Sequence, residues 1–226
     1  SAVHGFAGPG RVSPASVDRD GNANLIDAAT AARADVVLVS VVGASPEHPM
    51  ELFRAKAAAE RHLRASGTPW TIVRATAFVE LWGELLARSV VFGRGGNPIN
   101  FVSVRDVAAA IERAVLEAAW RGRVIEIGGP RDLSLNELAE RVQRLRGRDA
   151  NVRHVPLTVL RALGTFNRQA RAAVAMDTID MTFDAAPARR SLGDLPMTDA
   201  LTALSQTTAG DRAPGSPAPT TSTTSH

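Results

Sequence analysis

Lys56 is the only lysine in the chain, and it lies in an alanine-rich stretch, Phe53 to Glu60, that predicts a helix. The remaining 25 of the 26 Lys and Arg residues are arginines. A guanidinium is bulkier than an ammonium and cannot lose its proton near neutral pH. Lys56 is therefore a candidate for a position that needs a compact or tunable cation, and the alternative is an ordinary surface lysine.

Other residue types limit the chemistry that could surround Lys56. The chain contains no tyrosine and no cysteine, which excludes disulfides, thiolate metal sites and cysteine nucleophiles. Asp106 and Glu137 each follow a serine by three residues, the spacing of a helix capping box, and are interpreted as caps rather than catalytic acids. No metal site is predicted, because no ligand spacing links the five histidines: His4, His48, His62, His154 and His226.

The composition is that of a globular protein, with 45% apolar residues among 226. No apolar run reaches the ~18 residues of a membrane span, and the first residues lack a signal-peptide layout. We therefore expect a soluble, cytoplasmic protein with no membrane partner. The net charge is only +3 despite a pI of 10.7, and many arginines stand beside acids, so no nucleic-acid partner is expected.

Strands and helices are expected to alternate along most of the chain. Continuous β-branched runs at 36–42 and 70–74 predict strands buried on both faces, as in a parallel sheet. With the helix expected at 50–66 they form a βαβ unit. Two further strands are expected, in the apolar stub 1–3 and at 124–127, and residues 100–102 are expected to be a short extended piece. Amphipathic spacing predicts the remaining helices at 14–33, 77–88, from Ser103 for about four turns, from Ser134, at 157–176 and at 198–204.

The glycines at the start of the chain invite comparison with a phosphate-binding loop. Gly5, Gly8 and Gly10 follow the stub, but such a loop needs a full buried strand before it, and Pro9 removes a donor from the loop itself. The strand 36–42 also carries no acidic residue at its end to bind a ribose. A plain glycine loop is the better interpretation.

Several motifs in a fixed order resemble the atypical short-chain dehydrogenase/reductases, most closely the NmrA-like, NAD(P)H-binding branch. The resemblance covers about residues 1 to 200. It is carried by Val39-Ser40, Lys56-Ala57-Ala58-Ala59-Glu60, Ser66-Gly67-Thr68-Pro69-Trp70-Thr71-Ile72-Val73-Arg74, Asn100 to Ala108, Ile127-Gly128-Gly129-Pro130 and Leu133 to Leu138.

The resemblance implies an α/β fold of Rossmann type, with a mostly parallel sheet and flanking helices, a bound NAD(P), and reduction of a small carbonyl, quinone or similar substrate. NADP is slightly preferred over NAD. The best-known family members pair a tyrosine with a lysine four residues later. Here Leu52 stands four residues before Lys56 and the chain has no tyrosine, so that mechanism is excluded and no catalytic side chain is assigned.

The resemblance also assigns candidate site residues. Lys56 would donate to the ribose hydroxyls of the cofactor, and Ser40 would make either a cofactor contact or a local hydrogen bond. The segment Ala75-Thr76-Ala77-Phe78 would run beneath the nicotinamide. Phe78, Leu81 and Trp82 would form a substrate wall, or alternatively pack into the core at their helical spacing.

One Rossmann-like domain is expected over residues 1–206, with its substrate side at about 78–100 and 128–206 and a disordered tail over 207–226. Roughly sixty residues that carry the family's first strands and glycine-rich turn have no equivalent here. The sequence is therefore interpreted as the second half of the fold. Three functions remain open: an NAD(P)-dependent reductase, a non-catalytic NAD(P)-binding regulator, or a shortened chain that acts through protein contacts and binds NADPH weakly or not at all. A homo-oligomer is also possible.

Overall fold

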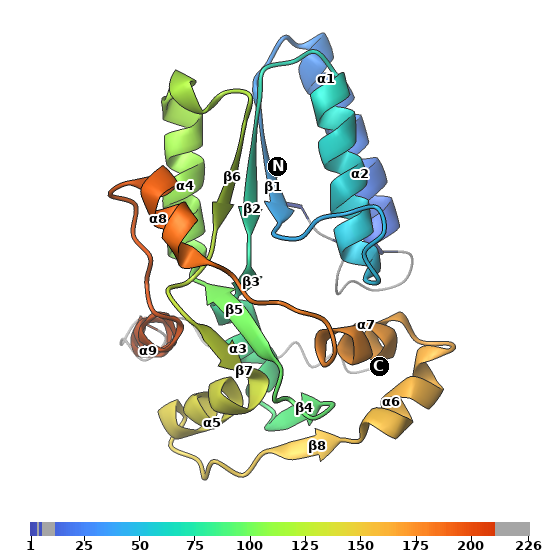
Figure 1. Cartoon of the computed structure of the whole chain (residues 1–226), viewed down its shortest axis with the longest axis vertical. Helices are drawn as coiled ribbons and strands as arrows, with labels where there is room; N and C mark the ends of the chain where they lie inside the picture. The colour runs from blue at the N-terminus through green and yellow to red at the C-terminus, as the bar shows by residue number, and fades with distance from the viewer. Residues whose placement is uncertain (4, 6–11, 211–226) are drawn as a thin grey trace, which may run out of the picture.

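The computed structural model describes residues 1–3, 5 and 12–210 of the 226-residue chain. Its strands are β1 (Val36–Val41), β2 (Trp70–Ala75), β3 (Ala77–Phe78), β4 (Val90–Phe92), β5 (Pro98–Val102), β6 (Arg123–Ile127), β7 (Asp132–Ser134) and β8 (Arg153–Val155). Its helices are η1 (Pro14–Gly21), α1 (Asn22–Ala31), α2 (Glu51–Ala65), α3 (Val79–Leu86), α4 (Val104–Leu116), η2 (Ala118–Trp120), α5 (Leu135–Leu145), α6 (Leu157–Gly164), α7 (Arg168–Met176), α8 (Ala185–Leu192) and α9 (Ala200–Gly210). Figure 1 shows their arrangement.

A three-stranded parallel sheet in the order β1-β2-β6 forms the upper half of the molecule (Figure 1). The strands are in register, so their carboxyl ends at Val41, Ala75 and Ile127 lie together at one edge. Ser1 lies on the outer side of β1, where its carbonyl accepts a hydrogen bond of 2.9 Å from Val39 N. The stub 1–3 thus contacts the sheet, but the prediction of a strand there is wrong, because these residues form no regular strand.

Helices cover both faces of this sheet (Figure 1). On one face, α1 and α2 bury Ile26 and Leu63 against Leu38 of β1. On the other face, α4 and α8 bury Ala110 and Leu192 beside Val73 and Ile125. Burial from both sides explains the continuous apolar runs of β1 and β2, because neither face needs polar residues. The predicted α/β fold with a parallel sheet is confirmed.

Apart from η1 and η2, the other elements gather beyond the carboxyl edge of the sheet (Figure 1). There β5 pairs with β3 in parallel and with β7 in antiparallel, and β4 pairs in parallel with β8. A separate hydrophobic core packs these elements against one another. Its buried members include Val79, Phe101, Leu138 and Leu204. The sequence analysis missed β4, β7 and β8 because strands of three residues show no measurable alternation.

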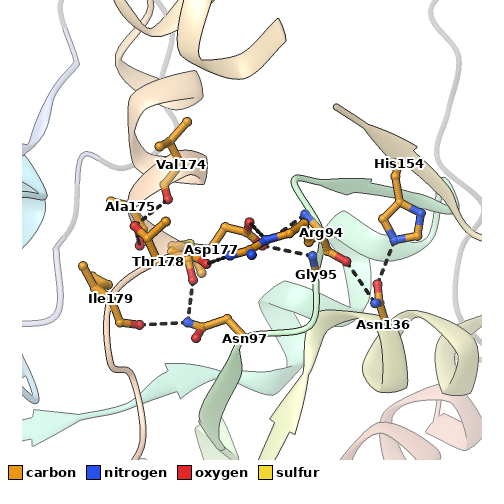
Figure 2. A network of polar contacts seen from close by, with 11 residues as sticks. Arg94, Gly95, Asn97, Asn136, His154, Val174, Ala175, Asp177, Thr178 and Ile179 are labelled. Atoms are coloured by element: carbon orange, nitrogen blue, oxygen red, sulfur yellow. Dashed lines mark hydrogen bonds and ion pairs between the residues drawn. The ribbon is translucent and has the colours of Figure 1, made fainter. Parts of the chain in front are cut away.

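Asp177, at the end of α7, fixes the loop between β4 and β5 (Figure 2). Its Oδ1 accepts hydrogen bonds from Arg94 N at 3.1 Å and Gly95 N at 3.0 Å, and its Oδ2 accepts from Arg94 Nε at 2.9 Å. Asn97 adds hydrogen bonds to the carbonyls of Met176 and Ile179. These contacts connect the end of α7 to the loop between β4 and β5.

Two predicted helices are interrupted. The helix expected at 14–33 begins as the π-helix η1, which Ser13 caps and Pro14 opens, and continues as α1 to Ala31. The helix expected at 157–176 is two helices, because the chain turns at Thr165 to Asn167 and the side chain of Asn167 caps α7. Apolar spacing alone could not locate either break.

Of the two predicted capping boxes, one is present in the structure and the other is not. At α5 both hydrogen bonds between Ser134 and Glu137 are present, as predicted. The interpretation of Asp106 as a helix cap is wrong. Its buried carboxylate instead accepts hydrogen bonds from the backbone N and the hydroxyl of Thr198, at 2.6 and 2.8 Å.

The last helix also runs further than expected. The tail was predicted to begin at residue 207, whereas α9 continues to Gly210. Residues 211–226, and residues 6–11 of the predicted glycine loop, lie outside the described part of the chain.

Candidate functional site

A cavity of about 380 Å³ lies at the carboxyl edge of the parallel sheet. In open α/β sheets ligands bind at this edge, outside the ends of the strands. All eight candidate site residues line the cavity: Ser40, Lys56, Ala75, Thr76, Ala77, Phe78, Leu81 and Trp82. The structure therefore brings together residues that were chosen from three separate stretches of sequence.

Lys56 is a buried residue with 5% of its surface exposed, so the alternative of an ordinary surface lysine is wrong. Its Nζ donates to the carbonyls of Val39 at 3.0 Å and Val3 at 3.2 Å. It also lies 3.0 Å from Oδ1 of Asp18, whose side chain is fully buried. The ammonium thus donates to two backbone carbonyls and pairs with one carboxylate within the protein.

Asp18 joins the glycine segment to this cluster, because its Oδ2 accepts a hydrogen bond of 2.8 Å from Gly5 N. The residue was not selected from the sequence, where the pattern Asp18-Arg19-Asp20 resembles a solvated surface run. Only the fold shows that Asp18 points inward while Asp20 pairs with Arg19 at the surface. Lys56 and Asp18 together hold η1, α2 and β1 at the cavity.

Ser40 makes the local hydrogen bond that was one of its two predicted roles. Its hydroxyl donates to Oε1 of Glu60 at 2.6 Å, and Arg74 donates to both carboxylate oxygens of Glu60 at 2.9 and 2.8 Å. Burial of Glu60 raises its carboxyl pKa, but hydrogen bonds from Arg74 and Ser40 and the charges of Arg74 and Arg64 outweigh burial and leave the pKa below its ordinary value. The hydroxyl of Ser40 therefore donates its proton to a hydrogen bond within the protein.

Thr76 and Asn100 link the end of β2 to β5 and to the loop after β6. Thr76 Oγ1 donates to Oδ1 of Asn100 at 2.9 Å, and the same oxygen accepts from Gly129 N at 2.8 Å. The amide nitrogen of Asn100 reaches Oδ1 of Asp132 at 2.9 Å. The buried amide thus fixes the backbone of residues 75–78 relative to the neighbouring strands.

The rest of the cavity wall is largely apolar. Trp82 is partly buried and packs edge-to-face against Phe101, with ring centroids 6.5 Å apart. Phe78 is also partly buried, whereas Leu81 is 41% exposed at the rim. Phe78 and Trp82 therefore both line the cavity and pack on the core, so the two predicted alternatives are not exclusive. Further lining comes from Met50, Leu52, Phe53, Met176 and Met181.

His48 is a cavity residue that the sequence analysis passed over. Its ring stacks on Phe53 with centroids 3.9 Å apart, and its Nδ1 accepts a hydrogen bond of 3.1 Å from Met50 N. The proton of the neutral ring is therefore on Nε2. Burial lowers the pKa of His48, so the imidazole is neutral at neutral pH. A sequence search for metal spacing could not find it, because its partner is a backbone amide.

Comparison with known proteins places this site in a family. A model described as NAD(P)H-binding matches residues 2–118, which is more than half of the chain. The chain belongs to this NAD(P)H-binding family. The predicted NAD(P)H-binding branch is confirmed by this match, and solved reductases and an epimerase share the fold.

Individual relatives of this NAD(P)H-binding chain have different printed functions. Photosystem II assembly factor Ycf39 from Synechocystis is 28% identical over 159 residues, which cover 67% of this chain and 49% of that protein. NAD(P)H azoreductase from Xenophilus azovorans is 27% identical over 146 residues, which cover 62% and 50%. The chain thus spans about half the length of these curated relatives.

Solved structures confirm the Rossmann-type fold. An NADPH-dependent quinone oxidoreductase from Escherichia coli has a TM-score of 0.66 at 23% identity, covering 83% of this chain and 73% of that one. Triphenylmethane reductase from Citrobacter, solved with NADP(H), has a TM-score of 0.67 at 16% identity, covering 88% and 73%. Within the residues that the structure describes, no helix is long and apolar enough to span a membrane.

Proposed function

We propose that this segment forms the nicotinamide and substrate side of an NAD(P)H-dependent reductase for a small apolar acceptor, such as a quinone or an aromatic carbonyl compound. The observation that carries the proposal is the cavity at the carboxyl edge of the sheet, where strand-end residues 39–43 and 75–78 meet an apolar wall. Apolar pockets with a few polar groups are typical of small-molecule sites. Because the chain spans about half of its curated relatives, the activity is proposed for the protein that contains this segment.

The residues present fit the nicotinamide end of such a cofactor through their backbone and their apolar surface. The turn 75–78 leaves the sheet where a Rossmann ligand binds, and Thr76 and Asn100 hold it in place. Lys56 Nζ and the hydroxyl of Ser40 already contact groups of the protein. Lys56 could therefore donate to a ribose only if it gave up one of these contacts. We therefore favour a positioning role for Lys56 and keep the ribose contact as a prediction.

NAD(P)H, when bound, supplies the hydride for the reduction. The side chains of this segment would exclude water from the acceptor and hold it against the apolar wall formed by Phe78, Trp82 and Met176. A carbonyl or quinone oxygen that gains negative charge needs a hydrogen-bond donor. Among the side chains described at the cavity, the N–H groups of His48 Nε2 and Trp82 Nε1 have no protein acceptor. His48 is our candidate donor to the acceptor oxygen.

The same proposal includes three further points: a preference for NADP over NAD, a small-molecule substrate, and a cytoplasmic location. Support for NADP comes from two fold neighbours solved with NADPH or NADP(H). We propose no nucleic-acid partner, and a homo-oligomer remains part of the proposal.

The test has a binding arm and an activity arm. Isothermal titration of the 226-residue chain with NADPH should show binding weaker than micromolar, since the segment holds only one side of the expected site. The protein containing this segment should consume NADPH when a quinone, an azo dye or an aromatic aldehyde is added. No consumption with any acceptor, in a protein that binds NADPH, would contradict the reductase proposal.

A non-catalytic NAD(P)-binding role is the second candidate. It is favoured by the engagement of Lys56 and Ser40 within the protein, which leaves the site without a conventional catalytic side chain. One relative is an assembly factor rather than a reductase by name. NADPH binding without acceptor-dependent oxidation would support this candidate.

A further inference from the structure

We propose that the hairpin of α6 and α7 is a binding surface for an anionic lipid bilayer. The surface, which we call the hairpin tip, comprises residues 159–171. It lies in the lower right of Figure 1, at the end of the molecule opposite to α4 and α8. The proposal goes beyond the reductase function, does not depend on it, and replaces the expectation from the sequence that the protein has no membrane partner.

The first observation is an apolar cluster that faces water. Val159 and Leu163 lie one turn apart on α6 and are 45% and 52% exposed. Phe166, in the turn after α6, is 96% exposed, the largest value among the exposed hydrophobic side chains of the described chain. A fully exposed phenylalanine beside two exposed aliphatic residues gains free energy when it enters a less polar phase.

The second observation is the charge around this cluster. Residues 151–176 contain four arginines, Arg153, Arg161, Arg168 and Arg171, and not one aspartate or glutamate. This stretch departs from the mixed charges elsewhere in the chain. Anionic lipids attract such basic segments, by about 1 kcal/mol for each Lys or Arg near the surface.

The cations lie close to the apolar side chains. Arg168 follows Phe166 by two residues, and the backbone of Arg171 packs against Gly164, where an added Cβ would lie 3.6 Å from it. Arg168 has one long ion pair, 3.7 Å to Glu51. Arg161 and Arg171 form no ion pair with any residue that the structure describes. Their charges are therefore available to an external anion.

The combination favours a bilayer over the other polyanions. Phosphate backbones of nucleic acids attract the same arginines but give no role to exposed Val159 and Leu163. A second copy of the chain could cover the apolar residues, but it would bring the three arginines of one hairpin tip against those of the other. Apolar side chains that enter the acyl boundary, with cations among the headgroups, account for both observations.

The hairpin also connects the proposed surface to the cavity. α7 begins at Arg168 in the hairpin tip and ends at Met176, which lines the cavity. A protein held at a bilayer by this hairpin would keep that wall of the cavity on the membrane side of the molecule.

Vesicle sedimentation tests the proposal with the 226-residue chain. Vesicles of phosphatidylcholine with phosphatidylserine should bind the chain, vesicles of phosphatidylcholine alone should bind it much less, and added salt should release it. Phe166→Ser with Leu163→Ser should remove most of the binding. Arg161→Gln with Arg171→Gln should weaken it by roughly 25-fold, since each arginine is worth about 1 kcal/mol.

Matched control variants come from the opposite end of the molecule. Leu116→Ser removes a 75% exposed apolar residue at the end of α4, and Arg189→Gln with Arg190→Gln removes two exposed arginines on α8. Both controls should bind vesicles like the wild type, and circular dichroism should show that all variants remain folded. Equal loss in the controls, or equal binding to neutral vesicles, would overturn the proposal.

Two further results would also overturn it. Binding to a DNA duplex as strong as to anionic vesicles, and unchanged by Phe166→Ser, would assign the arginines to nucleic acid. A concentration-dependent dimer that Phe166→Ser dissociates, in a chain that does not bind vesicles, would assign the surface to a second copy.

Discussion

The Nζ atom of Lys56 lies 3.0 Å from Oδ1 of Asp18, and the two side chains are 6% and 0% exposed. This buried ion pair joins α2 to η1 beside the cavity. The carbonyls of Val39 and Val3 complete the surroundings of the ammonium. The pair explains in structural terms why a chain that otherwise uses arginine keeps one lysine.

We expect Lys56→Arg to destabilise the protein by about 1–3 kcal/mol. A guanidinium has five N–H donors, and the pocket offers only the two carbonyls and the carboxylate that surround the ammonium, so the additional donors would be buried without partners. Urea unfolding measures the change. Arg61→Lys, an exposed exchange of the same two residue types on the same helix, is the control and should change stability little.

Breaking the pair from one side should cost more. Lys56→Met leaves the carboxylate of Asp18 buried and unpaired, and Asp18→Leu leaves the ammonium unpaired, so each should lose about 3–5 kcal/mol. The double variant should be more stable than the sum of the single losses predicts. Simple additivity of the two losses would show that the charges do not interact.

The stability of the protein should depend on pH through Glu60. Its folded pKa lies below the ordinary 4.5, so its contribution is complete above that pH and is lost as the pH falls through the folded value. Glu60→Gln should cost about 2–3 kcal/mol at neutral pH, because the hydrogen bonds from Arg74 lose their charged acceptor. Urea unfolding at several pH values should show this difference shrinking below pH 4.5; a constant difference would contradict the linkage.

The sequence predicted those parts of the molecule whose signal is local. β1, β2, β6 and α2 were located within two residues, because long apolar runs and Gly67 mark them. The cavity lining was predicted from the resemblance, and the parallel register then brings Ser40 and Ala75 to the same edge. Local pattern was sufficient for these strands and for α2, whereas the lining residues needed the order of several motifs along the chain.

Long-range side-chain contacts were not predictable in this way. Lys56 reaches Val3, 53 positions away, and Asp106 accepts from Thr198, 92 positions away. Asp106 shows the reason most clearly. Its spacing from Ser103 satisfies the capping pattern, yet a competing donor from a distant segment binds the carboxylate. Sequence spacing identifies a group that could accept a hydrogen bond, but only the packed chain determines which donor reaches it.

Asp177→Ala should release the loop that joins β4 to β5 (Figure 2). The carboxylate accepts hydrogen bonds from the backbone N–H groups of Arg94 and Gly95. Its removal leaves both N–H groups without this acceptor and should lower the free energy of unfolding by about 2–3 kcal/mol. Hydrogen exchange of these two amides should become faster. Asp177→Asn keeps an acceptor oxygen and should have a smaller effect; equal effects of the two substitutions would show that the contact is not a hydrogen bond to Oδ1.

The last prediction concerns His48 and is conditional on reductase activity. If Nε2–H donates to the acceptor oxygen, His48→Ala should lower kcat by roughly 10²–10³-fold and leave the Kd for NADPH unchanged. Because burial lowers the pKa of His48, its neutral form should persist to a lower pH than that of an ordinary histidine, and kcat should decline only at a pH below 6.5. His62→Ala is the matched control, since His62 is exposed and pairs with Asp27 at 2.6 Å, away from the cavity lining. An unchanged kcat in His48→Ala, with normal NADPH binding, would leave the ring of His48 with only its packing role against Phe53.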